Sequence, residues 1–214
     1  MSEASFEIRV CDSCGLRYPL QAGGSFGIRC PLCLGETRVV LRKSIREEER
    51  IITTAAATDG ILRAVLLDNI RSAWNVGSIL RSADGFGFDR VYLCGITPTP
   101  DNEAVTKTSL GAEKTLRWSH HKDAVKLATG LKEDGWRVFA LEEGKDAEDI
   151  HSLSIAPGER IVLILGSETT GVDPDLLKLS DGIHSIPMRG YKRSLNVAIA
   201  FSVAAFALST QGGR

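Results

Sequence analysis

Four cysteines near the N-terminus have the type and spacing that bind a metal ion. Cys11 and Cys14 form one C-x-x-C pair, Cys30 and Cys33 form a second, and fifteen residues separate the two pairs. Four thiolates from two such pairs can complete a tetrahedral site for structural zinc. The surrounding segment has few large apolar residues, so we expect its fold to depend on the metal. A redox pair or incidental thiols would be the alternative interpretation, and a single C-x-x-C would favour it.

Glycines accompany both cysteine pairs, with Gly15 directly after the first and Gly35 just beyond the second. Glycine lets the backbone turn so that amide N–H groups face the sulfurs. When all four ligands come from the protein, the module is structural or serves in recognition. Its basic residues could bind RNA phosphates or could simply be solvated; they are Arg9, Arg17, Arg29, Arg38, Arg42 and Lys43. The fifth cysteine, Cys94, ends an apolar run and is expected to be a core thiol.

A second group of candidates consists of polar residues that follow apolar, strand-like runs. Asn75 lies where a helix is expected to begin, so capping is its simplest role. Arg81 lies off the apolar side of that helix. It could form a surface ion pair, or it could present a fixed positive charge to a nucleophile or a phosphate.

Two further segments of this kind occur towards the C-terminus. Gly166 and Glu168 directly follow a buried strand, where glycine allows a ligand to approach the backbone, although Glu168 could simply cap the next helix. No P-loop and no G-x-G-x-x-G opening a helix after a strand is present. The third segment runs from Ile186 to Asn196. Ser194 could be a helix cap, whereas Asn196, expected inside a buried helix, would need polar partners.

The elements that must position these residues alternate between strands and helices. We expect strands at 62–67, 90–94, 136–141, 160–165 and 183–186, and helices around 76–83, 123–134 and 194–209. This alternation predicts an α/β fold with a parallel sheet, whose ligands bind at the carboxyl ends of the strands. The last helix is apolar nearly all round, so we expect it to be buried.

Composition and segment boundaries suggest a small module followed by one larger domain. We expect a zinc ribbon at 1–42, a linker helix at 43–60 with Ser44 and Glu47 as a capping box, and the main domain at 61–214. The 214 residues are 43% hydrophobic and carry a net charge of −1, so RNA contacts would need a local basic patch. No signal-peptide pattern is present and the longest apolar stretch is too short to span a bilayer. We therefore expect a cytoplasmic protein without a membrane partner.

The three polar segments, in this order and placement, resemble the motifs of the SpoU family of RNA ribose 2′-O-methyltransferases. This family, also called the TrmH family, belongs to the SPOUT superfamily, and the resemblance covers about 62–208. Asn75, Gly77 and Arg81 resemble the first motif of the family. Gly166, Glu168 and Gly171 resemble the second. The third resembles Ile-Pro-Met at 186–188 followed by Ser-Leu-Asn at 194–196.

The resemblance implies a parallel-sheet SPOUT fold with a C-terminal trefoil knot, a homodimer with its active site near the subunit interface, and S-adenosylmethionine as cofactor. It assigns to Arg81 the stabilisation of a developing alkoxide, because a permanent cation is a poor proton acceptor. The residues expected to orient Arg81, the ribose and the cofactor are Asn75, Glu168, Ser194 and Asn196. The expected cofactor-binding residues are Leu141, Gly166, Ile186, Met188, Ser194 and Leu195, although core packing is an equal alternative for Met188.

Three alternative functions remain open from the sequence. A methyltransferase of the same superfamily that acts on a base nitrogen is one, and a non-catalytic RNA-binding module with the knot as scaffold is another. The third is a zinc-ribbon interaction protein whose α/β domain only dimerises, which leaves the three motifs unexplained. For the preferred function, both tRNA and rRNA are possible substrates, and the lack of a long basic tail slightly favours tRNA.

Overall fold

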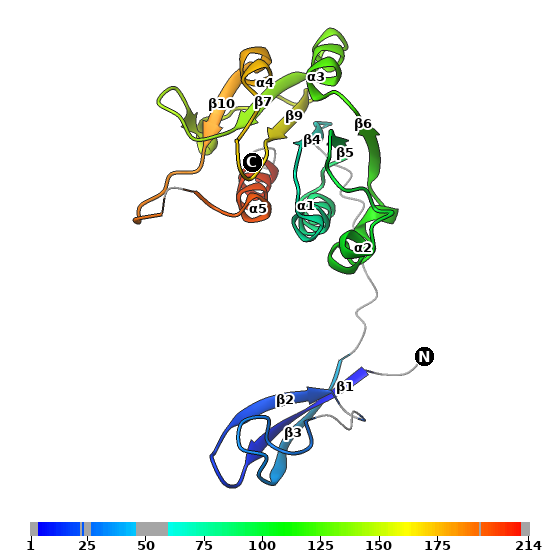
Figure 1. The fold of residues 1–214 in the computed structure, drawn as a ribbon, viewed down its shortest axis with the longest axis vertical. Helices are drawn as coiled ribbons and strands as arrows, with labels where there is room; N and C mark the ends of the chain where they lie inside the picture. Colours follow the sequence, from blue (N-terminus) through cyan, green and yellow to red (C-terminus); the bar gives the residue numbers. More distant parts are fainter. Residues whose placement is uncertain (1–3, 22, 24–26, 46–59, 193, 211–214) are drawn as a thin grey trace. The chain divides into compact units, whose positions relative to one another are not determined.

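A computed structural model of the protein describes residues 4–21, 23, 27–45, 60–192 and 194–210. The chain divides into two compact units, residues 1–53 and 54–214 (Figure 1). Among the described residues, no helix combines the length and the apolar character needed to cross a membrane.

The N-terminal unit is a three-stranded antiparallel sheet in the order β2-β1-β3. Its strands are β1 (Ala4–Cys11), β2 (Arg17–Gln21) and β3 (Thr37–Ile45). Cys11 ends β1 and pairs with Thr37 at the start of β3. The segments that carry both C-x-x-C pairs therefore lie at one end of the sheet. On the sheet itself, Glu7 accepts from Arg9 at 2.7 Å and from Arg42 at 2.9 Å.

The start of the linker helix predicted at 43–60 is wrong. Lys43 to Ile45 continue β3, and Ser44 pairs with Ser5 of β1. Ladder hydrogen bonds to β1 fix the backbone of Ser44 in the extended conformation, which outweighs the local capping signal of Ser44 and Glu47. Residues 46–59 of the predicted helix lie outside the described residues.

The C-terminal unit contains a seven-stranded sheet whose pairings are all parallel, in the order β6-β5-β4-β9-β7-β10-β8. Its strands are β4 (Leu62–Asp68), β5 (Arg90–Cys94), β6 (Arg117–His121), β7 (Arg137–Leu141), β8 (Glu148–Asp149), β9 (Arg160–Leu165) and β10 (Gly182–Ser185). Its helices are α1 (Ala73–Gly85), α2 (Glu103–Ser109), α3 (Ala124–Glu133), α4 (Pro174–Leu179) and α5 (Val197–Ser209), with 3₁₀ turns η1 (Ala112–Lys114) and η2 (Ile150–Ser152).

Both faces of this sheet are covered, as expected for a parallel sheet (Figure 1). Val65 and Leu67 of β4 point into the apolar cluster shared with α1 and α5, and Ala64 and Leu66 point into the cluster on the α3 and α4 side. Side chains that alternate between two buried faces explain why the central strands have continuous apolar sequences. The predicted α/β fold with a parallel sheet is confirmed.

The last helix differs from its prediction in two ways. It begins at Val197, not at Ser194, because Asn196 is its cap and accepts from the Ala198 amide at 2.9 Å. It is also not buried all round. One side of α5 packs on the core, whereas Ile199, Val203 and Phe206 are 54%, 37% and 56% exposed.

Strand order creates a change of direction in the middle of the sheet. From β4 the chain adds β5 and then β6 on one side, whereas β9 lies between β4 and β7 on the other. Ligands bind at such switch points, beyond the carboxyl ends of the strands. The C-terminal trefoil knot remains a prediction, because strand order alone does not define how the chain is threaded.

Candidate active site and metal centre

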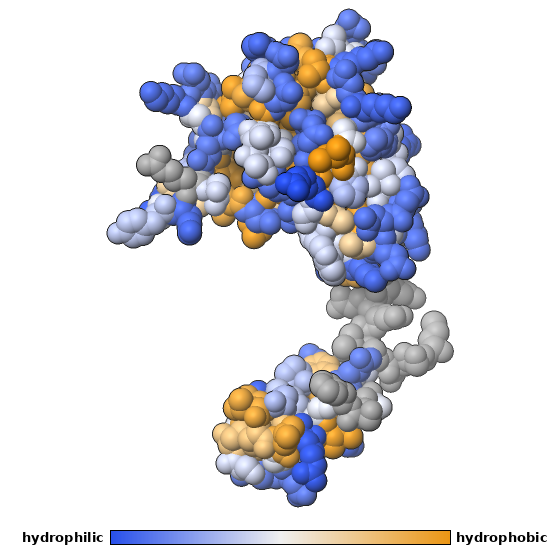
Figure 2. Space-filling model, viewed as in Figure 1, coloured by the Kyte–Doolittle hydropathy of each residue, from blue (hydrophilic) through white to orange (hydrophobic). Residues whose placement is uncertain are grey.

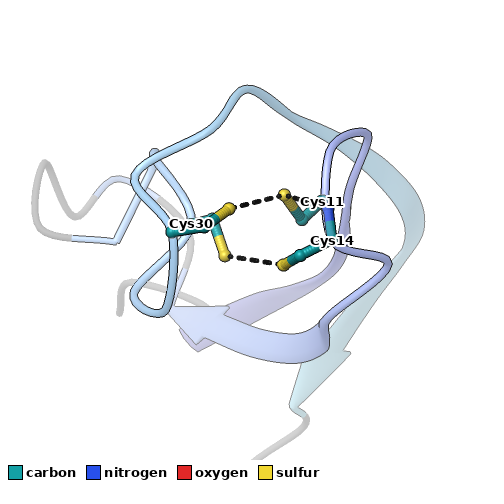
Figure 3. Close-up of side chains that lie close together, drawn as sticks. Cys11, Cys14 and Cys30 are labelled. Carbon is teal, nitrogen blue, oxygen red and sulfur yellow. Dashed lines mark hydrogen bonds between the residues drawn. The ribbon is translucent and has the colours of Figure 1, made fainter.

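The four N-terminal cysteines come together as the sequence predicts. Their four Sγ atoms all lie within 4.8 Å of one another. The Sγ atoms of Cys11 and Cys33 are 3.5 Å apart, and those of Cys14 and Cys30 are 3.6 Å apart (Figure 3). A disulfide would need about 2.05 Å, whereas a tetrahedral ion with bonds of about 2.3 Å spaces its sulfurs by about 3.8 Å. The cluster therefore fits a structural zinc ion.

Backbone amides already face the sulfurs of this cluster. The amides of Ser13 and Cys14 donate to the Cys11 sulfur, and the Leu32 amide donates to the Cys30 sulfur, each at 3.4 Å. The Cys14 amide is the main cause that lowers the pKa of Cys11 to about 6, against the opposing effect of desolvation. Thiolates are the species that bind zinc, so these amides favour the metal-binding form of Cys11.

The two cysteine loops use glycine differently from the prediction. Gly15 has the expected left-handed conformation, with φ of +73°, but in the second loop Leu34 takes that conformation, with φ of +60°. Gly35 is required for another reason. A Cβ there would lie 2.7 Å from the Ser13 hydroxyl and 3.2 Å from the Cys33 sulfur, so glycine lets the two loops approach.

In the C-terminal unit, hydrogen bonds join the three polar segments. The Asn75 amide nitrogen donates to Glu168 Oε1 at 3.0 Å, and the Asn75 oxygen accepts from Asn196 Nδ2 at 3.1 Å. Glu168 also accepts from the backbone amides of Arg71, at 3.0 Å, and Ser72, at 3.3 Å. Residues separated by more than ninety positions in the chain thus share one network around the start of α1.

The charge of Glu168 is stabilised by this network. Partial burial by itself would raise its pKa, but the hydrogen bonds from Arg71, Asn75 and Ser72 reverse that effect and hold the pKa below its usual range. Glu168 is therefore an acceptor, fixed in its ionised form at neutral pH. It is not poised to exchange a proton in that range.

Two simple interpretations of the asparagines are corrected by these contacts. The cap of α1 is Ser72, whose hydroxyl accepts from the Asn75 backbone amide at 3.3 Å, so the Asn75 side chain is available for the network. Asn196 is an exposed cap and not a buried amide inside a helix. Its carbonyl oxygen caps α5 and its amide nitrogen reaches Asn75, so one side chain links the helix to the site.

A cavity of about 390 Å³ opens at the carboxyl ends of β7, β9 and β10. The six residues predicted to bind the cofactor all line it: Leu141, Gly166, Ile186, Met188, Ser194 and Leu195. Glu168 and Asn196 line it as well. Its volume lies in the range of sites for small molecules and cofactors, and its walls combine aliphatic side chains with carboxylates.

The sequence interpretation missed Glu142, which directly follows β7 and lines the same cavity. Its carboxylate accepts from the Val172 amide at 2.7 Å and from the Glu143 amide at 3.1 Å. Glu142 thereby fixes the loop after β9 against the end of β7. A carboxylate directly after a predicted strand was the available signal.

The motif glycines allow close contacts between backbones. A Cβ on Gly166 would lie 2.2 Å from the carbonyl carbon of Gly171, and Gly171 itself has φ of +73°. A Cβ on Gly77 would lie 1.9 Å from the Thr108 hydroxyl and 2.3 Å from the Val105 carbonyl. Glycine at 77 is what allows α2 to pack directly on α1.

Arg81 lies on α1 but not among the residues that line the cavity. Its side chain is exposed, and within the described part of the chain it has no hydrogen-bond or ion-pair partner. The surface ion pair considered from the sequence is therefore not formed. The guanidinium is available to a group that the single chain does not supply.

The profile of the SpoU rRNA Methylase family matches residues 63–206, which include all three motifs. The chain belongs to this family. A curated relative, the tRNA (guanosine(18)-2′-O)-methyltransferase of Thermus thermophilus, is 32% identical over 147 residues, which cover 69% of this chain and 74% of the relative.

Solved structures agree with this membership. The TrmH/SpoU tRNA modifying enzyme of A. aeolicus is 25% identical with a TM-score of 0.61, covering 72% of this chain and 75% of the other. An AdoMet-bound rRNA methyltransferase from Sinorhizobium meliloti is also 25% identical, with a TM-score of 0.64, and the match covers 68% of this chain and 55% of the other. The parallel-sheet SPOUT fold predicted from the motifs is thereby supported, and this chain spans only about half of the Sinorhizobium protein.

Proposed function

We propose that this SpoU-family protein transfers a methyl group from S-adenosylmethionine to a ribose 2′-hydroxyl of tRNA or rRNA. The observation that carries the proposal is the network of Asn75, Glu168 and Asn196, which joins all three family motifs beside one cavity. The Thermus thermophilus relative, which by its name methylates the 2′-oxygen of a tRNA guanosine, supports the same reaction class.

The cavity suits S-adenosylmethionine in its apolar surface and in its charge. Leu141, Ile186 and Leu195 offer apolar surface for the flat adenine ring. The carboxyl groups of Glu142, Glu143 and Glu168 also line the cavity and favour a cationic ligand. When bound, the cofactor supplies a methyl group on a positively charged sulfur, already activated for displacement.

The chain must then position a ribose and stabilise its oxygen as it becomes a nucleophile. Asn75 and Asn196 are held by their mutual hydrogen bond and by Glu168, so their polar groups are preorganised. Arg81 keeps its charge at any physiological pH, and we assign to it the stabilisation of negative charge on the 2′-oxygen. Ser194, which lines the cavity, is the remaining candidate for orienting the ribose or the cofactor.

We propose a homodimer formed through α5. The exposed side chains of Ile199, Val203 and Phe206 follow one another at intervals of four and three residues, so they form one apolar stripe. Apolar stripes of this kind are typical of interfaces between subunits. A second subunit on this stripe lies close to Asn196, the cap of the same helix, which agrees with an active site near the interface.

The N-terminal unit fits a structural metal, and we propose that it is a zinc ribbon that assists RNA binding. Arg17 and Lys43 of this unit have no acidic partner among the described residues, which leaves them available to phosphates. Figure 2 shows apolar surface, in orange, on the same unit, whose exposed apolar side chains are Ile28, Leu32, Leu34, Val40 and Leu41. We also propose that the protein acts on its RNA in the cytoplasm. Methylation of this RNA would be a step in the processing of tRNA or rRNA.

Methyl transfer from labelled S-adenosylmethionine to total tRNA, and separately to rRNA, tests the proposed function. We expect label in one RNA class and a 2′-O-methyl nucleoside after complete digestion. A base-methylated nucleoside would replace the proposal with the alternative of base-nitrogen methylation. RNA binding without any transfer, in protein that binds the cofactor, would favour the non-catalytic module.

A further inference from the structure

Trp74 exposes a large apolar side chain beside the proposed active site. It lies in the first turn of α1, directly before Asn75, and it is 60% exposed. The other two tryptophans behave differently, because Trp136 is 6% exposed and Trp118 packs against the core. The Trp74 side chain takes no part in the hydrogen-bond network, and most of it is exposed. Neither the network nor packing in the core therefore explains an aromatic ring at this position.

Two arginines lie on either side of Trp74 in the sequence. Arg81 follows it by seven residues, which places Arg81 and Trp74 on the same side of α1, and Arg71 lies three residues before it, ahead of the cap Ser72. Both arginine side chains are exposed, and neither has an acidic partner within the part of the chain that the structure describes. The backbone amides of Arg71 and Ser72 donate to Glu168, so the segment that leads into α1 is anchored to the network.

An aromatic ring between two arginines has the chemistry of a site for single-stranded RNA. Bases that are not paired stack on aromatic side chains, and guanidinium groups bind the adjacent phosphates. A second copy of this chain would have to bring a carboxylate to each guanidinium group, whereas every nucleotide of an RNA strand carries a phosphate. The apolar stripe of α5 is the surface that we assign to the second copy.

We propose that Trp74 stacks on an unpaired base of the RNA substrate, at or next to the nucleotide whose ribose is methylated. This proposal rests on the proposed function and narrows its substrate to nucleotides in loops or bulges, since a base inside a duplex cannot reach the ring. Arg71 and Arg81 bind the flanking phosphates or the 2′-oxygen. Trp74 is a substrate-positioning residue and does not take part in the chemical step.

Trp74→Ala and Trp74→Phe, made in the full chain, test the proposal. We expect Trp74→Ala to raise the Kd and KM for total tRNA or rRNA about tenfold, with kcat within about threefold and the Kd of S-adenosylmethionine unchanged. Trp74→Phe retains a ring and should recover most of the RNA affinity. Leu62→Ala, at the opposite end of β4 from the site and 38% exposed, is the matched control and should bind RNA normally.

Tryptophan fluorescence gives a direct readout of stacking. The RNA that is methylated should quench wild-type fluorescence, and Trp74→Phe should abolish that quenching while still binding the RNA. Normal RNA affinity in Trp74→Ala, or unchanged quenching in Trp74→Phe, would overturn the proposal, as would a loss of dimer mass without a change in RNA affinity. Absence of methyl transfer by the wild type, with quenching intact, would instead overturn the proposed function alone.

Discussion

Glu168 connects two of the three motifs directly and the third through Asn75. Its carboxylate accepts from backbone amides at the start of α1 and from the Asn75 side chain, which in turn contacts Asn196. Acceptors that serve several donors must keep their negative charge to hold them all. The lowered pKa of Glu168 is the sign that the folded protein favours this charged form.

The charge of Glu168 should make its contribution to stability depend on pH. A carboxyl whose pKa is lower in the folded state stabilises the protein above its unfolded pKa of about 4.3, and this contribution is lost as the pH falls through the folded pKa. We expect Glu168→Gln to lower stability by about 1 kcal/mol at pH 7 and by less at about pH 3, where the carboxylate begins to be protonated. Thermal unfolding at both pH values measures this.

Glu143→Gln is the control for that experiment. Glu143 lines the same cavity, but its side chain forms no hydrogen bond among the described residues. The Glu143→Gln substitution should therefore lower the stability of the protein only slightly at either pH. An equal loss of stability in both variants, or a Glu168→Gln effect that is undiminished in acid, would show that the network does not depend on the ionised carboxylate.

At the scale of elements, Gly77 sets the distance between α1 and α2. The Cβ of an alanine there would overlap the Thr108 hydroxyl and the Val105 carbonyl. Because the carbonyl belongs to the backbone, the contact can be relieved only by moving one helix. Since α1 begins beside the network, its packing is part of how the site is positioned.

Gly77→Ala should therefore destabilise the protein, by about 1–3 kcal/mol. Gly85→Ala, the last position of the same helix, meets nothing within 4 Å and should be neutral or slightly stabilising, because alanine favours helix. Urea unfolding of both variants measures the difference. A Gly77→Ala protein as stable as Gly85→Ala would mean that the helices can separate without cost.

Periodicity predicted the elements that are long and buried, and failed where tertiary contacts decide. The strand at 160–165 was found with its boundaries, because both of its faces are covered and its sequence is continuously apolar. The short helices α2 and α4 were not predicted, since they offer fewer than eight residues of pattern. At Ser44 a good local helix signal lost to pairing with β1, which a local pattern does not contain.

The candidate site was predictable as far as the motifs reach. The family resemblance named the residues that line the cavity, but not how Asn75, Glu168 and Asn196 contact one another across the chain. Glu142 was missed because its role depends on a loop thirty residues away, at Val172. Leu34 shows a similar gap, since a left-handed leucine is set by the cysteine cluster and not by its own preference.

At the scale of the whole molecule, the two units have different sources of stability. Among the described residues of the N-terminal unit, the buried apolar side chains are Cys11 and Cys30, whereas the C-terminal unit has two apolar clusters on its sheet. A metal chelator should therefore unfold the N-terminal unit and leave cofactor binding by the other unit intact. Metal analysis, combined with amide NMR spectra before and after chelation, checks this.

Cysteine variants provide the control for the metal prediction. Cys14→Ser should abolish binding of about one zinc ion per chain, whereas Cys94→Ala should retain it, because Cys94 is buried in the other unit. Equal zinc content in both variants would contradict the assignment of the four-cysteine cluster as the metal site.

The proposed dimer should depend on the exposed stripe of α5. Val203→Glu places a charge in the middle of this stripe, and we expect it to reduce the mass in solution from twice the 23.1 kDa of one chain to a single chain. Ile96→Glu, at a residue that is 68% exposed elsewhere, should leave the mass unchanged. Sedimentation velocity measures both, and a Val203→Glu protein of dimer mass would exclude this surface.

The most direct test of ribose methylation is the alkali resistance of the labelled product. RNA is cleaved by alkali through the 2′-oxygen, so a methyl group on that atom protects the adjacent linkage. We predict that wild-type protein places label in alkali-resistant dinucleotides, that Arg81→Ala lowers the rate at least about 100-fold with cofactor affinity unchanged, and that Arg117→Ala, at an exposed arginine of β6, is active. Label released as single nucleotides, or near-normal transfer by Arg81→Ala, would contradict the account.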